Sequence, residues 1–113
     1  MRVLVADDNA ELMELYRAAL EGAGYEVVAA TTGAEAVAAA ERADFDAAVL
    51  DVLMPGGSGD AVAERLRVAK PKLPVLFVTG AYGDPFLGTS TRPVLHKPFT
   101  PEQLVGAVRA LTG

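Results

Sequence analysis

The sequence predicts an α/β fold, a doubly wound five-stranded parallel sheet covered by helices on both faces. Short apolar runs rich in β-branched residues recur along the chain, and each is too short for a helix. We expect strands at residues 2–6, 26–29, 47–50, 74–78 and 94–96. Helical patterns alternate with these runs, and strands joined by right-handed helical crossovers pair in parallel.

Three helices are expected in the first part of the chain. The first runs from about Asn9 to Gly22, and Asn9 suits the N-cap position. Its apolar residues recur at helical spacing, at Leu12, Leu15, Tyr16, Ala19, Leu20 and Ala23. A second helix begins near Thr32, where Thr32 and Glu35 have capping-box spacing, and a third follows Ser58.

The last third of the chain holds one clear helix start and one gap in the alternation. Thr100 caps the last helix, Pro101 takes its first position, Gln103 completes a capping box, and Gly113 ends it. Residues 80–93 contain three glycines and two prolines where a fourth helix is expected. That helix is therefore predicted to be short or absent.

Length and composition restrict the possible classes of function. At 113 residues the chain fits one domain, residues 1–113. The absence of cysteine excludes disulfides, thiolate metal sites and thiol nucleophiles. The net charge of -5 disfavours nucleic-acid binding, which relies on lysine and arginine. No apolar run approaches the roughly 20 residues that cross a bilayer and no signal-peptide pattern is present, so we expect a cytoplasmic protein.

Polar side chains follow four of the five predicted strands. Asp7 and Asp8 follow the first strand, Asp51 the third, Thr79 the fourth and Lys97 the fifth. All carboxyl ends of parallel strands lie on one edge of the sheet. If the strand order is 2-1-3-4-5, these residues converge beside the topological switch point, where such sheets bind ligands.

Four motifs at these positions carry a resemblance to a known family. They are Asp7–Asp8, the segment from Asp51 to Pro55 with Gly59 beyond it, Thr79–Gly80 and Lys97–Pro98. In this combination the chain resembles the receiver domains of two-component response regulators over essentially its full length. The resemblance implies a flavodoxin-like sheet in the order 2-1-3-4-5, and a cis peptide bond between Lys97 and Pro98.

The resemblance also implies a role for each residue of the cluster. Asp51 is the phosphoacceptor, and Thr79 and Lys97 contact the phosphoryl oxygens. The Mg²⁺ ligands are Asp7, Asp8, Asp51 and the backbone carbonyl of Leu53. The implied donor is a histidine kinase or a histidine phosphotransfer protein, the downstream partner is a protein of unknown identity, and neither nucleic acid nor membrane is a partner. Such a domain promotes its own phosphotransfer and dephosphorylation without being a conventional enzyme.

Elementary chemistry supports these roles. An aspartate has a reference pKa of about 3.9, so Asp51 needs no histidine base to become a nucleophile. Three clustered carboxylates repel one another, and a hard cation such as Mg²⁺ relieves that repulsion. The ammonium of Lys97 and the hydroxyl of Thr79 suit the stabilisation of phosphoryl oxygens.

Two features depart from the family pattern. Receivers usually carry an aromatic residue three positions before the lysine, and here that position is Val94. The spacing from Thr79 to Lys97 is also shorter than usual, as in receivers of hybrid kinases and some stand-alone receivers with an atypical fourth helix. The Gly-rich segment 80–93 could order on phosphorylation, which would provide another route for the signal.

Other functions stay open at this point. The chain could be a receiver-like interaction module that is never phosphorylated, although all the site residues are retained. An aspartyl-phosphate phosphohydrolase shares the nucleophile and the metal, but such enzymes generally have an acid where Leu53 stands. A phosphohistidine or metal role for His96 is disfavoured, because a lone histidine at a strand end is more often structural or solvated.

Overall fold

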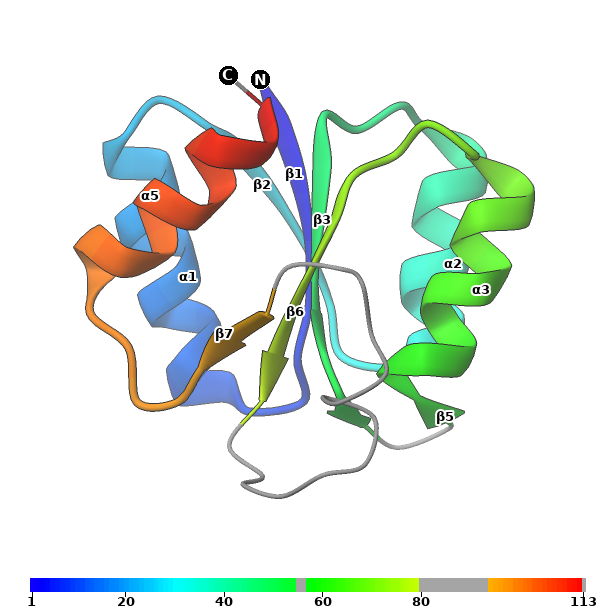
Figure 1. Cartoon of the computed structure of the whole chain (residues 1–113), viewed down its shortest axis with the longest axis horizontal. Helices are drawn as coiled ribbons and strands as arrows, with labels where there is room; N and C mark the ends of the chain where they lie inside the picture. Colours follow the sequence, from blue (N-terminus) through cyan, green and yellow to red (C-terminus); the bar gives the residue numbers. More distant parts are fainter. Residues whose placement is uncertain (55–56, 80–93, 113) are drawn as a thin grey trace.

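Five parallel strands form the central sheet of the computed structural model, which describes residues 1–54, 57–79 and 94–112 (Figure 1). Its strands are β1 (Arg2–Ala6), β2 (Glu26–Ala30), β3 (Ala47–Asp51), β6 (Val75–Thr79) and β7 (Val94–His96). Their order is β2-β1-β3-β6-β7, which confirms the predicted order 2-1-3-4-5. The predicted strand ends are right to within one residue.

Among the described residues, two pairs of helices cover the two faces of the sheet (Figure 1). On one face lie α1 (Ala10–Gly22) and α5 (Pro101–Thr112). On the other face lie α2 (Gly33–Arg42) and α3 (Gly59–Ala69). The predicted doubly wound α/β architecture is therefore confirmed.

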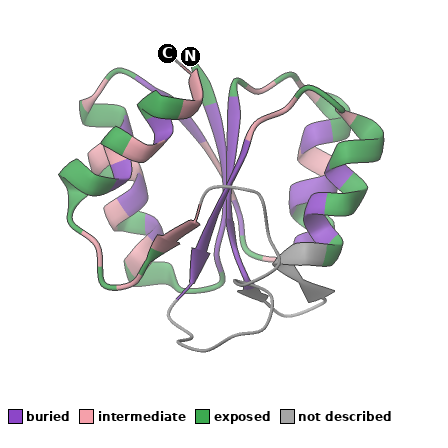
Figure 2. Cartoon of the chain, in the orientation of Figure 1, coloured by how far each residue is buried: buried purple, intermediate pink, exposed green. Residues whose placement is uncertain are grey.

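The sheet separates two apolar cores, and the buried strands run between the helix layers in Figure 2. Successive side chains of a strand point to opposite faces. In β1, Val3 and Val5 belong to the same core as Leu104 of α5, whereas Leu4 belongs to the core that contains Val37 of α2. Burial on both faces explains why these strands are almost continuously apolar.

Side chains cap the helices at the predicted residues. The side chain of Asn9 accepts a hydrogen bond from the backbone N–H of Leu12 at 3.0 Å. At the start of α5, the hydroxyl of Thr100 accepts from the N–H of Gln103 at 3.1 Å, and the Gln103 side chain accepts from the N–H of Thr100 at 2.8 Å. This reciprocal pair is the predicted capping box.

The cap of α2 differs in one detail from the prediction. Thr32 accepts from the N–H of Glu35 at 3.1 Å, as its spacing indicates. The Glu35 carboxylate, however, accepts from the backbone N–H of Thr31 at 2.8 Å and from its hydroxyl at 2.7 Å. Glu35 therefore receives two hydrogen bonds from Thr31, and these bonds lower the pKa of Glu35.

A short antiparallel hairpin follows β3, where the sequence indicated only a turn. It pairs β4 (Leu53–Met54) with β5 (Gly57–Ser58) and leads into α3. The predictions for a short fourth helix in residues 80–93 and for a helix end at Gly113 fall outside the described residues. Within the part of the chain that is described, no helix is both long and apolar enough to cross a membrane.

Candidate functional site

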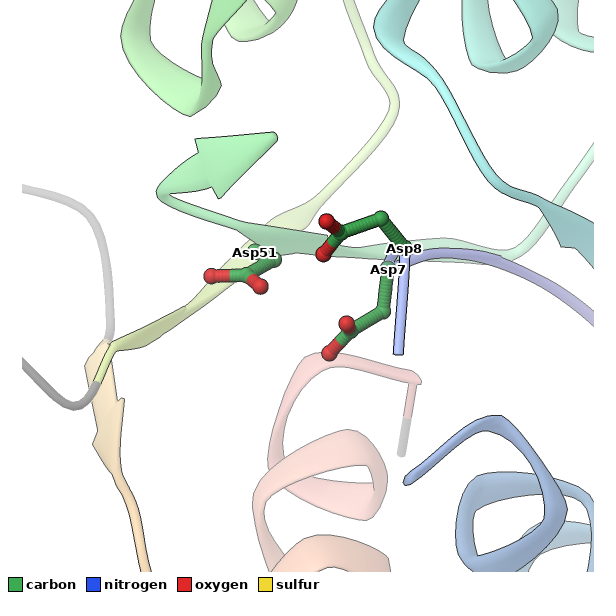
Figure 3. Close-up of side chains that lie close together, drawn as sticks. All are labelled: Asp7, Asp8 and Asp51. Carbon is green, nitrogen blue, oxygen red and sulfur yellow. The ribbon is translucent and has the colours of Figure 1, made fainter. Parts of the chain in front are cut away.

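Three aspartates meet at the carboxyl edge of the sheet (Figure 3). Asp7 and Asp8 follow β1, and Asp51 ends the neighbouring strand β3. One carboxylate oxygen from each residue lies within 4.8 Å of the others. Asp7 and Asp51 are buried, whereas Asp8 is exposed. The cluster is therefore shielded from solvent at Asp7 and Asp51 and accessible at Asp8. Such a group of carboxylates can hold a hard cation through its oxygen atoms.

Both oxygens of the Asp7 carboxylate have hydrogen-bond donors. Oδ1 accepts from the backbone N–H of Asn9 at 2.9 Å, and Oδ2 accepts from the hydroxyl of Tyr16 at 3.0 Å. Burial, reinforced by the negative charge of Asp7, raises the pKa of Tyr16 far above its usual range. The hydroxyl therefore stays protonated and acts as a donor.

Lys97 brings a positive charge to the acidic cluster. Its ammonium nitrogen lies 3.3 Å from Oδ2 of Asp51 and 3.6 Å from Oδ2 of Asp7. The backbone N–H of Lys97 donates to the carbonyl of Thr79 at 2.8 Å, which holds the lysine beside the end of β6. The peptide bond between Lys97 and Pro98 is cis, as the resemblance implied.

One ammonium does not balance three carboxylates. Asp7, Asp8 and Asp51 together carry three negative charges when ionised, and within the described residues Lys97 supplies one positive charge to them. The four groups therefore keep a negative excess that favours a divalent cation. Carboxylate oxygens are the ligand type that Mg²⁺ prefers, so the donor set fits this ion.

The remaining predicted site residues also lie at this edge of the sheet. Thr79 ends β6 beside β3 and is 1% exposed. Leu53 begins β4 two residues beyond Asp51, and Gly59 begins α3. Gly80, the partner of Thr79 in the predicted motif, falls outside the described residues.

Two further residues clarify what the sequence did and did not reveal. His96 is exposed at the end of β7, which fits the expectation that it is structural or solvated. Tyr16 was expected only as an apolar residue on the buried face of the first helix. Its ring is fully buried, and its centroid lies 5.7 Å from that of Phe99. A hydroxyl at a fully buried helix position was the one available signal, because such a group needs a polar partner.

Comparison with known proteins gives consistent results at the levels of sequence and fold. Residues 3–109 match the family model of the response regulator receiver domain. The transcriptional regulatory protein TcrA of Mycobacterium tuberculosis is 38% identical over 116 residues, which cover 99% of this chain and 46% of that protein. The chain thus spans about half the length of the curated relatives it matches.

Solved structures share the same fold. The chemotaxis protein CheY4 of Vibrio cholerae superimposes with a TM-score of 0.88 at 30% identity and covers 97% of each chain. The receiver domain of the sensor histidine kinase PA1611 from Pseudomonas aeruginosa superimposes with a TM-score of 0.90 at 24% identity, over 99% of this chain and 97% of that one. That structure carries a magnesium ion in its active-site cleft.

Proposed function

This chain belongs to the response regulator receiver domain family, and on that premise we propose that Asp51 accepts a phosphoryl group from a phosphohistidine donor. The observation that carries the proposal is the cluster of Asp7, Asp8 and Asp51 at the carboxyl edge of the sheet, with Lys97 against it. We propose that residues 1–113 act as one phosphoacceptor domain of a two-component system.

Asp51 suits the role of nucleophile. An ionised carboxylate attacks phosphorus directly, and the bond from phosphorus to the imidazole nitrogen of the donor breaks. The imidazole leaves as a neutral ring when its other nitrogen carries a proton. The product is an acyl phosphate on Asp51. The Asp51 side chain is 8% exposed, so most of it is shielded from water.

Asp7, Asp8 and Asp51 would hold Mg²⁺, with the backbone carbonyl of Leu53 as a further ligand. Receiver domains bind Mg²⁺ in an acidic pocket of this kind. When bound, the ion would offset the negative charge of the carboxylates and of the incoming phosphoryl group. The buried Asp7 would offer its carboxylate from the inner side of the site, and the exposed Asp8 would offer its carboxylate from the solvent side.

Lys97 and Thr79 would stabilise the transferred group. The Lys97 ammonium already lies 3.3 Å from the nucleophile, so a phosphoryl group on Asp51 meets it without a large movement. The Thr79 hydroxyl lies at the end of the adjacent strand β6 and would donate to a second phosphoryl oxygen. These groups supply electrostatic stabilisation, which is most of what phosphoryl transfer requires.

The proposed phosphoryl donor rests on the family, and the proposed downstream partner rests on relatives that are longer than this chain. Receiver domains take their phosphoryl group from histidine kinases, and we propose such a kinase or a histidine phosphotransfer protein as the donor. TcrA is named as a transcriptional regulator and is about twice as long as this chain. We propose that the domain signals to a downstream protein in the cytoplasm and that the receiver surface itself contacts neither nucleic acid nor membrane.

The test is intact-mass analysis after incubation with Mg²⁺ and a small acyl phosphate. The unsubstituted chain should gain the mass of one phosphoryl group, and Asp51→Asn should gain none. Asp44→Asn is the matched control, because Asp44 is an exposed aspartate at the opposite edge of the sheet, and it should react like the parent. A parent chain that forms no adduct would contradict the proposal and favour a receiver-like module without phosphorylation. Sustained hydrolysis of external phosphoesters would favour a phosphohydrolase.

A further inference from the structure

The Asp7 carboxylate is fixed by donors on both of its oxygens. Rotation about its Cβ–Cγ bond would break the bond from the Asn9 N–H to Oδ1 or the bond from the Tyr16 hydroxyl to Oδ2. A single donor would leave the carboxylate plane free to turn. The ammonium of Lys97, 3.6 Å from Oδ2, would then draw the carboxylate toward itself.

Tyr16 is itself held rigidly in place. It lies on α1, is 0% exposed, and belongs to the core that contains Leu20 and Leu104. Its ring packs at a tilt of 33° against Phe99, two residues beyond Lys97. The hydroxyl therefore has a fixed position relative to the strand end that carries Asp7 and to the segment that carries Lys97.

The hydroxyl itself is not required for packing. A phenylalanine would fill the same space in the core, because the two side chains differ only in the oxygen. The oxygen is useful at this position because it donates to a carboxylate of the acidic cluster. Groups that hydrogen-bond to metal-binding carboxylates fix the orientation of the ligand, and their loss weakens metal binding.

We propose that Tyr16 is a positioning residue of the metal site, whose hydroxyl fixes the orientation in which the Asp7 carboxylate meets the cation. This inference rests on the proposed Mg²⁺ site. Tyr16 acts only through Asp7 and contacts neither the cation nor the phosphoryl group. The residue type at position 16 thereby sets the Mg²⁺ concentration at which the domain becomes competent for phosphorylation.

The test compares Tyr16→Phe with Tyr25→Phe. Both variants lose a tyrosine hydroxyl that makes one 3.0 Å side-chain hydrogen bond, but Tyr25 bonds to Thr112 and lies just before β2, at the amino edge. The dissociation constant for Mg²⁺ is measured by calorimetry on the unphosphorylated chains. We expect it to rise about tenfold in Tyr16→Phe and to stay unchanged in Tyr25→Phe.

The Mg²⁺ dependence of phosphorylation distinguishes a positioning role of Tyr16 from a purely structural one. In Tyr16→Phe the Mg²⁺ concentration for half-maximal phosphorylation by acyl phosphate should rise by the same factor as the dissociation constant. At saturating Mg²⁺ the rate should return to that of the parent. A role in folding alone would lower the thermal midpoint and leave both Mg²⁺ measurements unchanged, which would overturn the inference.

A measurement on the unsubstituted chain keeps the test valid if Tyr16→Phe does not fold. With ¹³C at the tyrosine Cζ, an Mg²⁺ titration should shift the resonance of Tyr16 saturably and leave that of Tyr25 unmoved. A stationary Tyr16 resonance in a chain that binds Mg²⁺ would overturn the inference alone. A parent chain that binds no Mg²⁺ would overturn the proposed metal site as well.

Discussion

Charged side chains gather at both edges of the central sheet, but those at the amino edge are solvated and those at the carboxyl edge are largely buried. At the amino edge Arg2 pairs with Glu26, and Lys70 lies 2.7 Å from Asp44. The least exposed of these four side chains is 35% exposed. Exposed pairs of this kind contribute little, because water and salt screen the attraction.

At the carboxyl edge the same kinds of groups have lost most of their water. Lys97 is 27% exposed, Asp51 8% and Asp7 0%. Removing such charges from water costs free energy that the pairing only partly returns. A cluster with excess negative charge in that position is therefore better explained by a ligand than by stability. Burial, and not the presence of an ion pair, distinguishes the carboxyl edge from the amino edge.

The largest difference between the edges should appear when each loses its lysine. Lys97→Met removes the cation beside the nucleophile, so we expect phosphorylation by acyl phosphate at saturating Mg²⁺ to slow by about 10²- to 10³-fold. Lys70→Met removes the lysine of an exposed pair and should leave the rate unchanged. Intact-mass time courses measure both rates. Equal rates for the two variants would show that Lys97 has no special role in the transfer.

A second difference should appear as stabilisation by Mg²⁺. A ligand at a hundredfold excess over its dissociation constant stabilises the folded state by about 2.7 kcal/mol, so Mg²⁺ should raise the thermal midpoint and a chelator should reverse the rise. Asp8→Asn should remove most of this rise at little cost to the fold, because Asp8 is exposed. Asp44→Asn, its control at the amino edge, should keep the full rise. If Mg²⁺ raises the thermal midpoint of Asp8→Asn as much as that of the parent, the ion binds elsewhere.

The strand ends explain why so much of the site could be predicted. Asp7, Asp51, Thr79 and Lys97 each stand where an apolar run gives way to polar residues, and a parallel sheet brings all such positions to one edge. Strand pattern and topology together therefore place these residues near one another without any knowledge of side-chain contacts.

Contacts that depend on packing or on a choice between neighbouring donors could not be predicted in this way. Tyr16 occupies a helix position that any large apolar residue could fill, and its bond to Asp7 depends on how α1 packs against the end of β1. Glu35 has the spacing of a capping box with Thr32, yet its carboxylate accepts from both the N–H and the hydroxyl of Thr31. Sequence spacing therefore predicts which residues lie near one another, whereas the hydrogen-bond partner depends on the local geometry.

The smallest expected effect concerns the pH dependence of the Lys70–Asp44 pair. Its hydrogen bond and charge lower the pKa of Asp44. Any stabilisation from the pair is therefore present above the unfolded pKa of about 3.9 and is lost as the pH falls through the lower folded value. In Lys70→Met, carboxyl NMR titration should show the pKa of Asp44 returning toward its ordinary value.

Asp44 is 94% exposed, so the same substitution should change the thermal midpoint at neutral pH by much less than Mg²⁺ does. The difference between Lys70→Met and the parent should vanish in acid, where Asp44 is protonated in both folded and unfolded chains. Suppose instead that Lys70→Met lowers the thermal midpoint at neutral pH by as much as Mg²⁺ raises it in the parent chain. That result would mean that a solvated ion pair at the amino edge contributes as much to stability as ligand binding at the buried cluster. Burial would then no longer distinguish the two edges, and the argument for function at the carboxyl edge would depend on its reactivity alone.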